Sequence, residues 1–147
     1  MKDRPGLRSV VIDCGDPQRL AAFWAATLGW RIRPYTDEDV AALAKEGLTP
    51  ETDPSVCVDP PDPSLPTLWC NKVPESKVGK VRIHLDVNLA DRRAMERLIE
   101  LGASVVEERP GGNDWTIMAD PEGHEFCAFV LSEPATAQAV PGQASVL

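Results

Sequence analysis

The sequence contains no run of lysines and arginines and no long hydrophobic stretch. Its 147 residues carry a formal net charge of -8, with a pI of about 4.7. A groove that follows nucleic-acid phosphates needs clustered basic side chains, so we expect no nucleic-acid partner. A membrane-spanning helix needs about 18 or more apolar residues in a row, and no segment approaches that length. The first residues, MKDRPGLRSVVID, also lack the apolar core of a signal peptide, so we expect a cytoplasmic protein without a membrane partner.

Cysteine is sparse and dispersed, with no CxxC pair. The four positions are Cys14, Cys57, Cys70 and Cys127. In a reducing compartment such cysteines are more often small buried side chains than disulfide partners. The composition is otherwise that of a globular protein, 43% hydrophobic and 26% charged, and the length suits one domain.

The first half of the chain reads as a strand followed by a helix. Residues 7–14 (LRSVVIDC) form a short apolar run rich in β-branched side chains, which predicts a strand. Asp16 suits the N-cap of a following helix, Pro17 its first position, and Gly29 its end. The apolar residues of this helix recur at helical spacing, which predicts a face buried on a sheet: Leu20, Phe23, Trp24 and Leu28.

The second half repeats this order. Residues 81–88 (VRIHLDVN) alternate between apolar and polar side chains, which predicts a half-buried strand. Asp91 then suits the N-cap of a second helix, 75 residues after Asp16. Short strand candidates follow each helix at 30–35, 55–58 and 67–73, and at 103–109, 114–120 and 124–131. A further amphipathic helix, starting at Thr36 or Asp37, is expected in an insertion over residues 36–54.

Together these elements predict an α+β fold made of two βαβββ modules, at about 7–73 and 81–131. We expect a curved, mostly antiparallel eight-stranded sheet around a cleft, with the helices on its outer face. Residues 1–131 would form one domain. Residues 132–147 lack periodicity and large apolar side chains, so we expect a mobile tail there.

Three stretches of the sequence resemble the vicinal oxygen chelate (VOC) superfamily, the glyoxalase and bleomycin-resistance fold. They are VVIDCGDPQRLAAFWAATLGW, VPESKVGKVRIHLDV and DPEGHEFCAFV, in this order along the chain. The pattern is also similar to the glyoxalase-like domains common in actinobacteria, and it covers residues 7–131. The resemblance implies a small-molecule ligand in the cleft, and a homodimer, because these modules often pair between subunits.

The resemblance also implies positions for metal ligands. Metal-dependent members carry one ligand on the first and one on the last strand of each module, typically His, Glu, His and Glu. By position, the equivalents here are Ser9, Cys70, His84 and Cys127, so only His84 keeps the family residue. A glyoxalase I reaction needs a metal that holds an enediolate and a carboxylate that moves the proton, so we do not expect glyoxalase I activity.

Two interpretations of these positions remain open. If Cys70, His84 and Cys127 converge, they would form a Cys2His site with an open fourth position, which favours zinc. Glu125 shares the strand face of Cys127 and would then act as a general base or substitute ligand. Alternatively, both cysteines are small wall residues, no cofactor is required, and His84 is a polar residue of the cleft.

Further ligand-binding candidates follow from the polar strand faces. Arg82 and Asp86 share a face with His84, where Arg82 would pair with a carboxylate and Asp86 would orient the imidazole or hold a substrate hydroxyl. A solvated sheet edge is the alternative reading of that face. Ser9 and Asp13 share a face of the first strand, and either Trp69 or Trp115 would line an apolar pocket.

These candidates support two hypotheses about function. The first is a metal-free small-molecule binder or metal-independent enzyme that uses the polar cleft residues. The second is a divalent-metal lyase, isomerase or dioxygenase that uses His84 with Cys70, Cys127 or Glu125. The broken ligand set favours the first hypothesis, and the identity of the ligand is not encoded in any motif.

Overall fold

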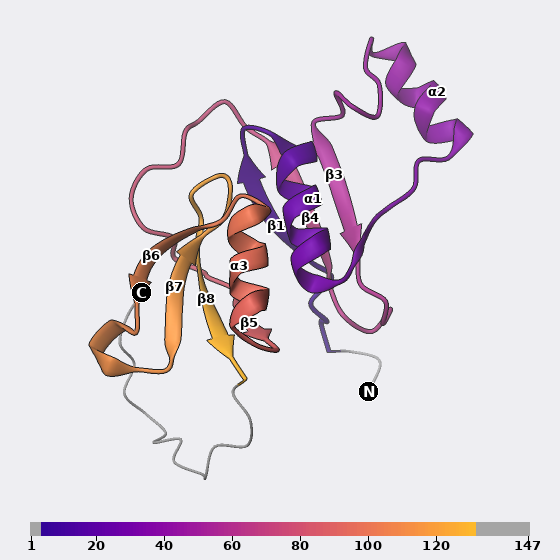
Figure 1. Ribbon diagram of the computed structural model, residues 1–147. Helices are drawn as coiled ribbons and strands as arrows, with labels where there is room; N and C mark the ends of the chain where they lie inside the picture. The colour runs from indigo at the N-terminus through magenta and orange to yellow at the C-terminus, as the bar shows by residue number, and fades with distance from the viewer. Residues whose placement is uncertain (1–3, 132–147) are drawn as a thin grey trace. The chain divides into compact units, whose positions relative to one another are not determined.

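The computed structural model describes residues 4–131 (Figure 1). The chain divides into two compact units between Ser76 and Lys77, which we call module one and module two. The two units correspond to the two predicted modules. The expected mobile tail, residues 132–147, lies outside the described residues.

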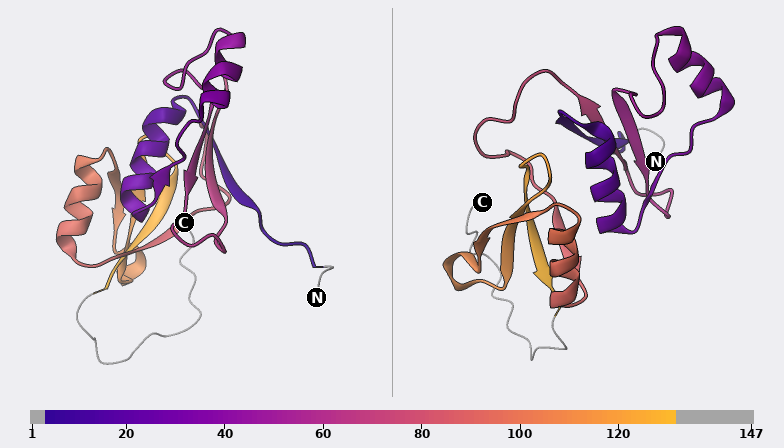
Figure 2. Two further views of the ribbon diagram at one scale, coloured as in Figure 1. Left: turned by 90° about the vertical axis from the view of Figure 1, so that its right-hand side faces the viewer. Right: turned by 45° about the horizontal axis from the view of Figure 1, so that its top comes forward.

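Module one contains four strands and two helices. They are β1 (Ser9–Cys14), α1 (Pro17–Leu28), β2 (Arg31–Ile32), α2 (Asp37–Lys45), β3 (Ser55–Asp59) and β4 (Thr67–Lys72). The strand order is β1-β4-β3-β2, with β1 parallel to β4 and the other pairs antiparallel. Helix α1 packs on β3 and β4, whereas α2 stands apart from α1 in the views of the ribbon (Figures 1 and 2).

Helix α1 begins and ends where the sequence predicts. The Asp16 carboxylate accepts a hydrogen bond from the backbone N–H of Arg19, and Pro17 occupies the first turn. Gly29 ends the helix in the left-handed region, with a φ of 66°. The buried face supplies the largest side chains of the module core, each at most 2% exposed: Leu20, Phe23 and Trp24. Leu28 is half-buried.

The strand register separates the two faces of the module-one sheet. Cys70 lies opposite Ile12 on β1 and opposite Val56 on β3, so these three buried side chains share the face that α1 covers. Trp69 lies opposite Val11 and Cys57, which places these residues on the other face. The two faces of β4 therefore carry a core thiol and a half-buried indole as direct neighbours in the sequence.

In its described residues, module two repeats the plan with a single α-helix and one short 3-10 helix. Its elements are β5 (Asp86–Leu89), α3 (Arg92–Glu100), β6 (Ser104–Glu108), the short helix η1 (Pro110–Gly112), β7 (Trp115–Ala119) and β8 (Glu125–Val130). The strand order is β5-β8-β7-β6, with β5 parallel to β8 and the other pairs antiparallel. Asp91 caps α3 as predicted, because its carboxylate accepts the backbone N–H of Ala94.

Strand β5 is shorter than predicted, because it begins at Asp86 and not at residue 81. The backbone N–H of Val81 donates to the Glu125 side chain and not to a neighbouring strand. Ile83 is 83% exposed, so the alternation of residues 81–85 has no buried face to match it within the described residues. The predicted strand was therefore wrong in its first half and correct from Asp86 onward.

The predicted α+β class and the two βαβββ modules are confirmed. Within residues 4–131 the eight strands form two mixed sheets of four where one eight-stranded sheet was expected, and each sheet has two antiparallel pairs and one parallel pair. The inserted helix α2 is also confirmed, with Thr36 as its N-cap in a capping box with Asp39. No helix within residues 4–131 is long and apolar enough to cross a membrane.

The cap of α1 gives a first prediction. We expect Asp16→Ala to lower the free energy of unfolding by about 1 kcal/mol, because the Arg19 N–H loses its acceptor. Urea denaturation followed by circular dichroism measures this change. Asp16→Asn keeps a side-chain oxygen and should stay close to the wild type; an equal loss in both variants would contradict a role as a cap.

Candidate functional site

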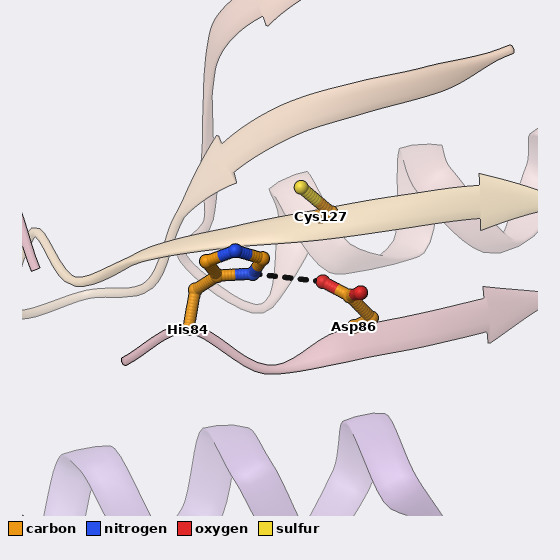
Figure 3. A group of neighbouring side chains, drawn as sticks. All are labelled: His84, Asp86 and Cys127. Atoms are coloured by element: carbon orange, nitrogen blue, oxygen red, sulfur yellow. Dashed lines mark hydrogen bonds and ion pairs between the residues drawn. The ribbon is translucent and has the colours of Figure 1, made fainter. Parts of the chain in front are cut away.

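Three polar side chains converge in module two: His84, Asp86 and Cys127 (Figure 3). His84 Nδ1 lies 2.8 Å from Asp86 Oδ1. One potential ligand atom from each residue lies within 4.8 Å of the other two. His84 and Asp86 are exposed, whereas Cys127 is 4% exposed. We call these residues the module-two triad.

Two neighbouring strands bring the triad together. Asp86 opens β5 and lies directly opposite Cys127 of β8 in the parallel register, so both side chains lie on one face of the sheet. The backbone N–H of Cys127 donates to the carbonyl of Leu85, which fixes the segment before β5 against β8. His84 lies in that segment, outside the regular strand, and its ring turns toward Asp86.

The turn between β7 and β8 sets the position of Cys127. The Asp120 carboxylate is buried and accepts hydrogen bonds from the backbone N–H groups of Glu122 and His124. The Asp120 N–H also donates to the His124 carbonyl, which closes the turn. His124 is therefore a turn residue, and the closed turn fixes the residue at which β8 begins to pair with β7.

The Asp86 carboxylate selects the tautomer of His84. An ionised carboxylate only accepts hydrogen bonds, so in the neutral imidazole the proton lies on Nδ1 and points to Asp86. The Nε2 atom then carries a lone pair, which can accept a proton or bind a metal. The arrangement can therefore act as a base oriented by a carboxylate.

The thiol of Cys127 is held in its protonated form. Burial raises the pKa of Cys127, and the charge of Asp86 and a hydrogen bond to it raise that pKa further, to about 11. Lys80 acts in the opposite direction. A thiol in this state is a weak nucleophile, and it must lose its proton before it can bind a metal.

Glu125 shares the face of Cys127 but is engaged elsewhere. Its carboxylate accepts hydrogen bonds from Lys77 Nζ at 3.1 Å and from the Val81 backbone N–H at 3.2 Å. Burial by itself would raise the pKa of Glu125, but hydrogen bonds from the backbone and from Lys77 outweigh it and lower the pKa. This ion pair holds residues 77–81 on β8, and Glu125 is not one of the converging ligand atoms in the described part of the chain.

Cys70 lies on the opposite face of its sheet from the position that corresponds to Cys127. Asp86 lies 70 residues after Asp16 and five residues before Asp91, so its equivalent in module one is Val11, five residues before Asp16. Val11 pairs with Trp69, as Asp86 pairs with Cys127. The predicted equivalence of Cys70 and Cys127 was therefore wrong by one residue. Cys70 is 0% exposed in the core under α1, and we leave it out of the proposed site.

The remaining predicted site residues are dispersed. Ser9 is half-buried and Asp13 exposed on β1, where they pair with Thr67 and Asn71. Arg82 is exposed in the segment before β5. Their roles in ligand binding stay predictions.

Trp69 lines a cavity of module one of about 250 Å³. Tyr35 and Asp53 line the same cavity and were missed, because Tyr35 falls in the strand predicted at 30–35 and Asp53 in the insertion. The signal in the sequence was the pairing of aromatic and acidic residues on either side of α2. Trp115, the alternative aromatic candidate, packs against Phe129 with ring centroids 5.6 Å apart.

The donor types of the module-two triad fit a divalent metal ion. An imidazole nitrogen, a carboxylate oxygen and a thiolate sulfur would leave a fourth position open, as in catalytic zinc sites. The sulfur ligand disfavours magnesium and calcium. Asp86 would either become a ligand or remain behind the imidazole as its hydrogen-bond acceptor.

Comparison with protein families shows to which family the chain belongs. The sequence profile of the family described as "Glyoxalase-like domain" matches residues 9–129. The chain belongs to this glyoxalase-like family. A search of curated protein sequences found no match.

Solved structures of the VOC superfamily share the fold of this glyoxalase-like protein. The fosfomycin resistance protein FosX from Mesorhizobium loti is 16% identical, with a TM-score of 0.59 over 86% of this chain and 91% of that chain. A variant of FosX from Listeria monocytogenes, in complex with Mn(II) and 1S,2S-dihydroxypropylphosphonic acid, is 14% identical, with a TM-score of 0.58 over 86% and 90%. A possible glyoxalase from Bacillus cereus is 14% identical, with a TM-score of 0.56 over 86% and 99%. At these identities the similarity establishes the fold.

The electrostatics of the triad give a second prediction. We expect Asp86→Asn to lower the pKa of the Cys127 thiol from about 11, because the neighbouring negative charge is removed while the burial remains. The ultraviolet absorbance of the thiolate, recorded against pH as a difference from Cys127→Ser, measures this pKa. Asp114→Asn removes an exposed charge outside the triad and should leave the titration unchanged. An unchanged titration in Asp86→Asn would mean that Asp86 does not act on the thiol.

Proposed function

We propose that this glyoxalase-like protein binds a small organic molecule without a metal requirement, with His84 as its central polar anchor. The single observation that carries the proposal is the 2.8 Å contact between His84 and Asp86, which orients the imidazole and leaves Nε2 available. We also propose a homodimer, as the family resemblance implies, and a cytoplasmic location, as the composition of the sequence leads us to expect.

The proposal includes both a binder and a metal-independent enzyme. Nε2 of His84 can hold a hydroxyl or N–H group of a ligand, and it can accept a proton from a carbon or oxygen acid of suitable geometry. Asp86 would stabilise the imidazolium that forms on proton transfer. Arg82, which is exposed in the same segment as His84, is proposed as a further polar contact in module two. Ser9 and Asp13 on β1 are proposed separately, as polar contacts for a ligand of module one.

The residues at the family's ligand positions support a metal-independent function. In module one these positions hold Ser9 and, by strand register, Trp69, and neither offers an imidazole, a carboxylate or a thiolate. In module two, His84 keeps the family residue and Cys127 replaces Glu. We therefore propose an activity other than glyoxalase I.

The proposal predicts ligand binding at His84 in the presence of a chelator. In a fragment screen followed by NMR, we expect polar fragments to shift the imidazole signals of His84. Asp86→Asn should weaken such binding by about tenfold, because a hydrogen bond to a charged group is lost and the tautomer is no longer selected. His124→Gln changes the other histidine and should leave the affinity unchanged. Fragments that shift the His84 signals only after a metal is added would contradict this proposal.

A divalent-metal enzyme is the second candidate, because three different ligand types lie within 4.8 Å. The metal would supply a Lewis acid for a chelated oxygen pair of the substrate. His84 and Cys127 would hold it, and Asp86 would either bind it or orient the imidazole. This candidate places a lyase, isomerase or dioxygenase activity in module two.

The two candidates differ in their response to cysteine variants. If the metal-based candidate is correct, titration with zinc, iron, manganese or nickel shows stoichiometric binding, which Cys127→Ala weakens at least about tenfold. Cys70→Ala also removes a buried thiol, but from the core under α1, and should keep the metal affinity. Isothermal titration calorimetry of chelator-treated protein measures the stoichiometry and the affinity of metal binding in each variant. Equal losses in the two variants would point to a general effect on folding, and absence of binding in the wild type would retire this candidate.

A further inference from the structure

The cavity of module one is a second candidate site, separate from the module-two triad in its residues. Every residue that lines it lies within residues 33–69, and it measures about 250 Å³. Small-molecule sites usually measure about 300 to 1,000 Å³, so this cavity suits a small ligand. Its lining combines aromatic rings with carboxylates: Tyr35, Asp39, Asp53 and Trp69.

The walls of the cavity are fixed by hydrogen bonds. Helix α2 carries Asp39 and Leu43 into the lining, and its capping box holds its first turn. The segment that returns from α2 is tied to α1, because the Gln18 amide donates to the carbonyls of Pro50 at 3.3 Å and Asp53 at 2.7 Å. The insertion is therefore anchored to the module, which gives the cavity a defined wall.

The cation that already lies in the lining is neutralised. Arg33 donates from Nε to Asp59 Oδ2 at 3.0 Å and from Nη2 to Asp59 Oδ1 at 2.7 Å. Its guanidinium carbon also lies 5.5 Å from the centroid of the Trp69 ring. The indole of Trp69 thus takes a cation on its ring in the structure itself, which is the favourable geometry for a cation–π contact.

The remaining charge of the lining is negative. Asp53 accepts the Tyr35 hydroxyl at 3.0 Å and the backbone N–H of Ser55 at 2.9 Å, and neither donor carries a positive charge. Hydrogen bonds from the backbone and hydroxyl of Thr36 lower the pKa of Asp39, so that carboxylate is ionised near neutral pH. The charge of Arg33 also lowers the pKa of Asp39, but within the described residues neither Asp39 nor Asp53 forms an ion pair.

Tyr35 responds to the same negative field. Burial raises its pKa, and the hydrogen bond to Asp53 and the charges of Asp53, Asp39 and Glu51 raise it further, to about 12. All three carboxylates act in one direction on a group at the cavity wall. The negative charge of these carboxylates would repel an anionic ligand and attract a cationic one.

We propose that the module-one cavity binds a small organic ammonium ion, with Asp53 and Asp39 supplying the countercharge and Trp69 and Tyr35 the aromatic surface. An ammonium carried on methyl or methylene groups matches both features, because its charge interacts with the carboxylates and its carbons pack on the rings. The inference goes beyond the function proposed for His84, and it stands or falls on residues of module one alone.

Choline and 3,3-dimethyl-1-butanol test the proposal, because they differ in replacing a charged nitrogen by a neutral carbon. The full chain is labelled with nitrogen-15, and the indole N–H signal of Trp69, assigned with Trp69→Phe, is followed during titration. We expect choline to shift this signal in a saturable way, with an affinity at least about fivefold higher than that of the neutral alcohol. Sodium chloride at equal ionic strength is the control for screening.

A matched pair of variants localises the charge effect. Asp53→Asn keeps the side-chain shape and the acceptor for Ser55 but removes the charge, so choline should bind about tenfold more weakly. Asp37→Asn removes a charge from the first turn of α2, outside the cavity lining, and should leave the affinity for choline unchanged. Equal binding of the two probes, an equal loss in both variants, or no shift of the Trp69 signal in the wild type would each overturn the proposal.

Discussion

In module two, β8 is hydrogen-bonded in parallel to β5, and this pairing places Cys127 directly opposite Asp86. Everything proposed for the triad depends on that register. A slip of one residue would turn Cys127 into the core under α3 and bring Phe126 to the polar face. The buried Asp120 carboxylate, which closes the preceding turn, is the structural reason that the register is held.

In module one, β1 and β4 form the equivalent parallel pair, but they carry different side chains. Val11 and Trp69 occupy the positions of Asp86 and Cys127, so an apolar pair stands where module two carries polar ligand types. The two modules therefore present different side chains from the same order of strands. Module two presents titratable groups, and module one presents an aromatic side chain, Trp69, in a small cavity that residues of the inserted helix α2 also line.

The segment before β5 shows how a break in regular structure creates the triad. In a regular strand, side chains two residues apart are separated by about 6.6 Å along the chain. His84 and Asp86 are two residues apart, and their side chains bridge this backbone spacing to a contact of 2.8 Å, with His84 just outside the regular strand. The Glu125 carboxylate also holds this segment, because it accepts hydrogen bonds from the Val81 N–H and from Lys77.

Local features of the sequence predicted the two modules, the caps at Asp16 and Asp91, and a third helix starting at Thr36 or Asp37. The family resemblance singled out His84 as a candidate site residue. Helix caps and hydrophobic periodicity depend on residues that are close together in the sequence, so they can be predicted without knowing the tertiary contacts. The tertiary structure alone decided that Cys70 belongs to the core, because the face of a β residue depends on a register set by distant partners. It also decided that Tyr35, Asp53 and Trp69 share a cavity, since hydrogen bonds between separate elements bring the insertion onto the sheet.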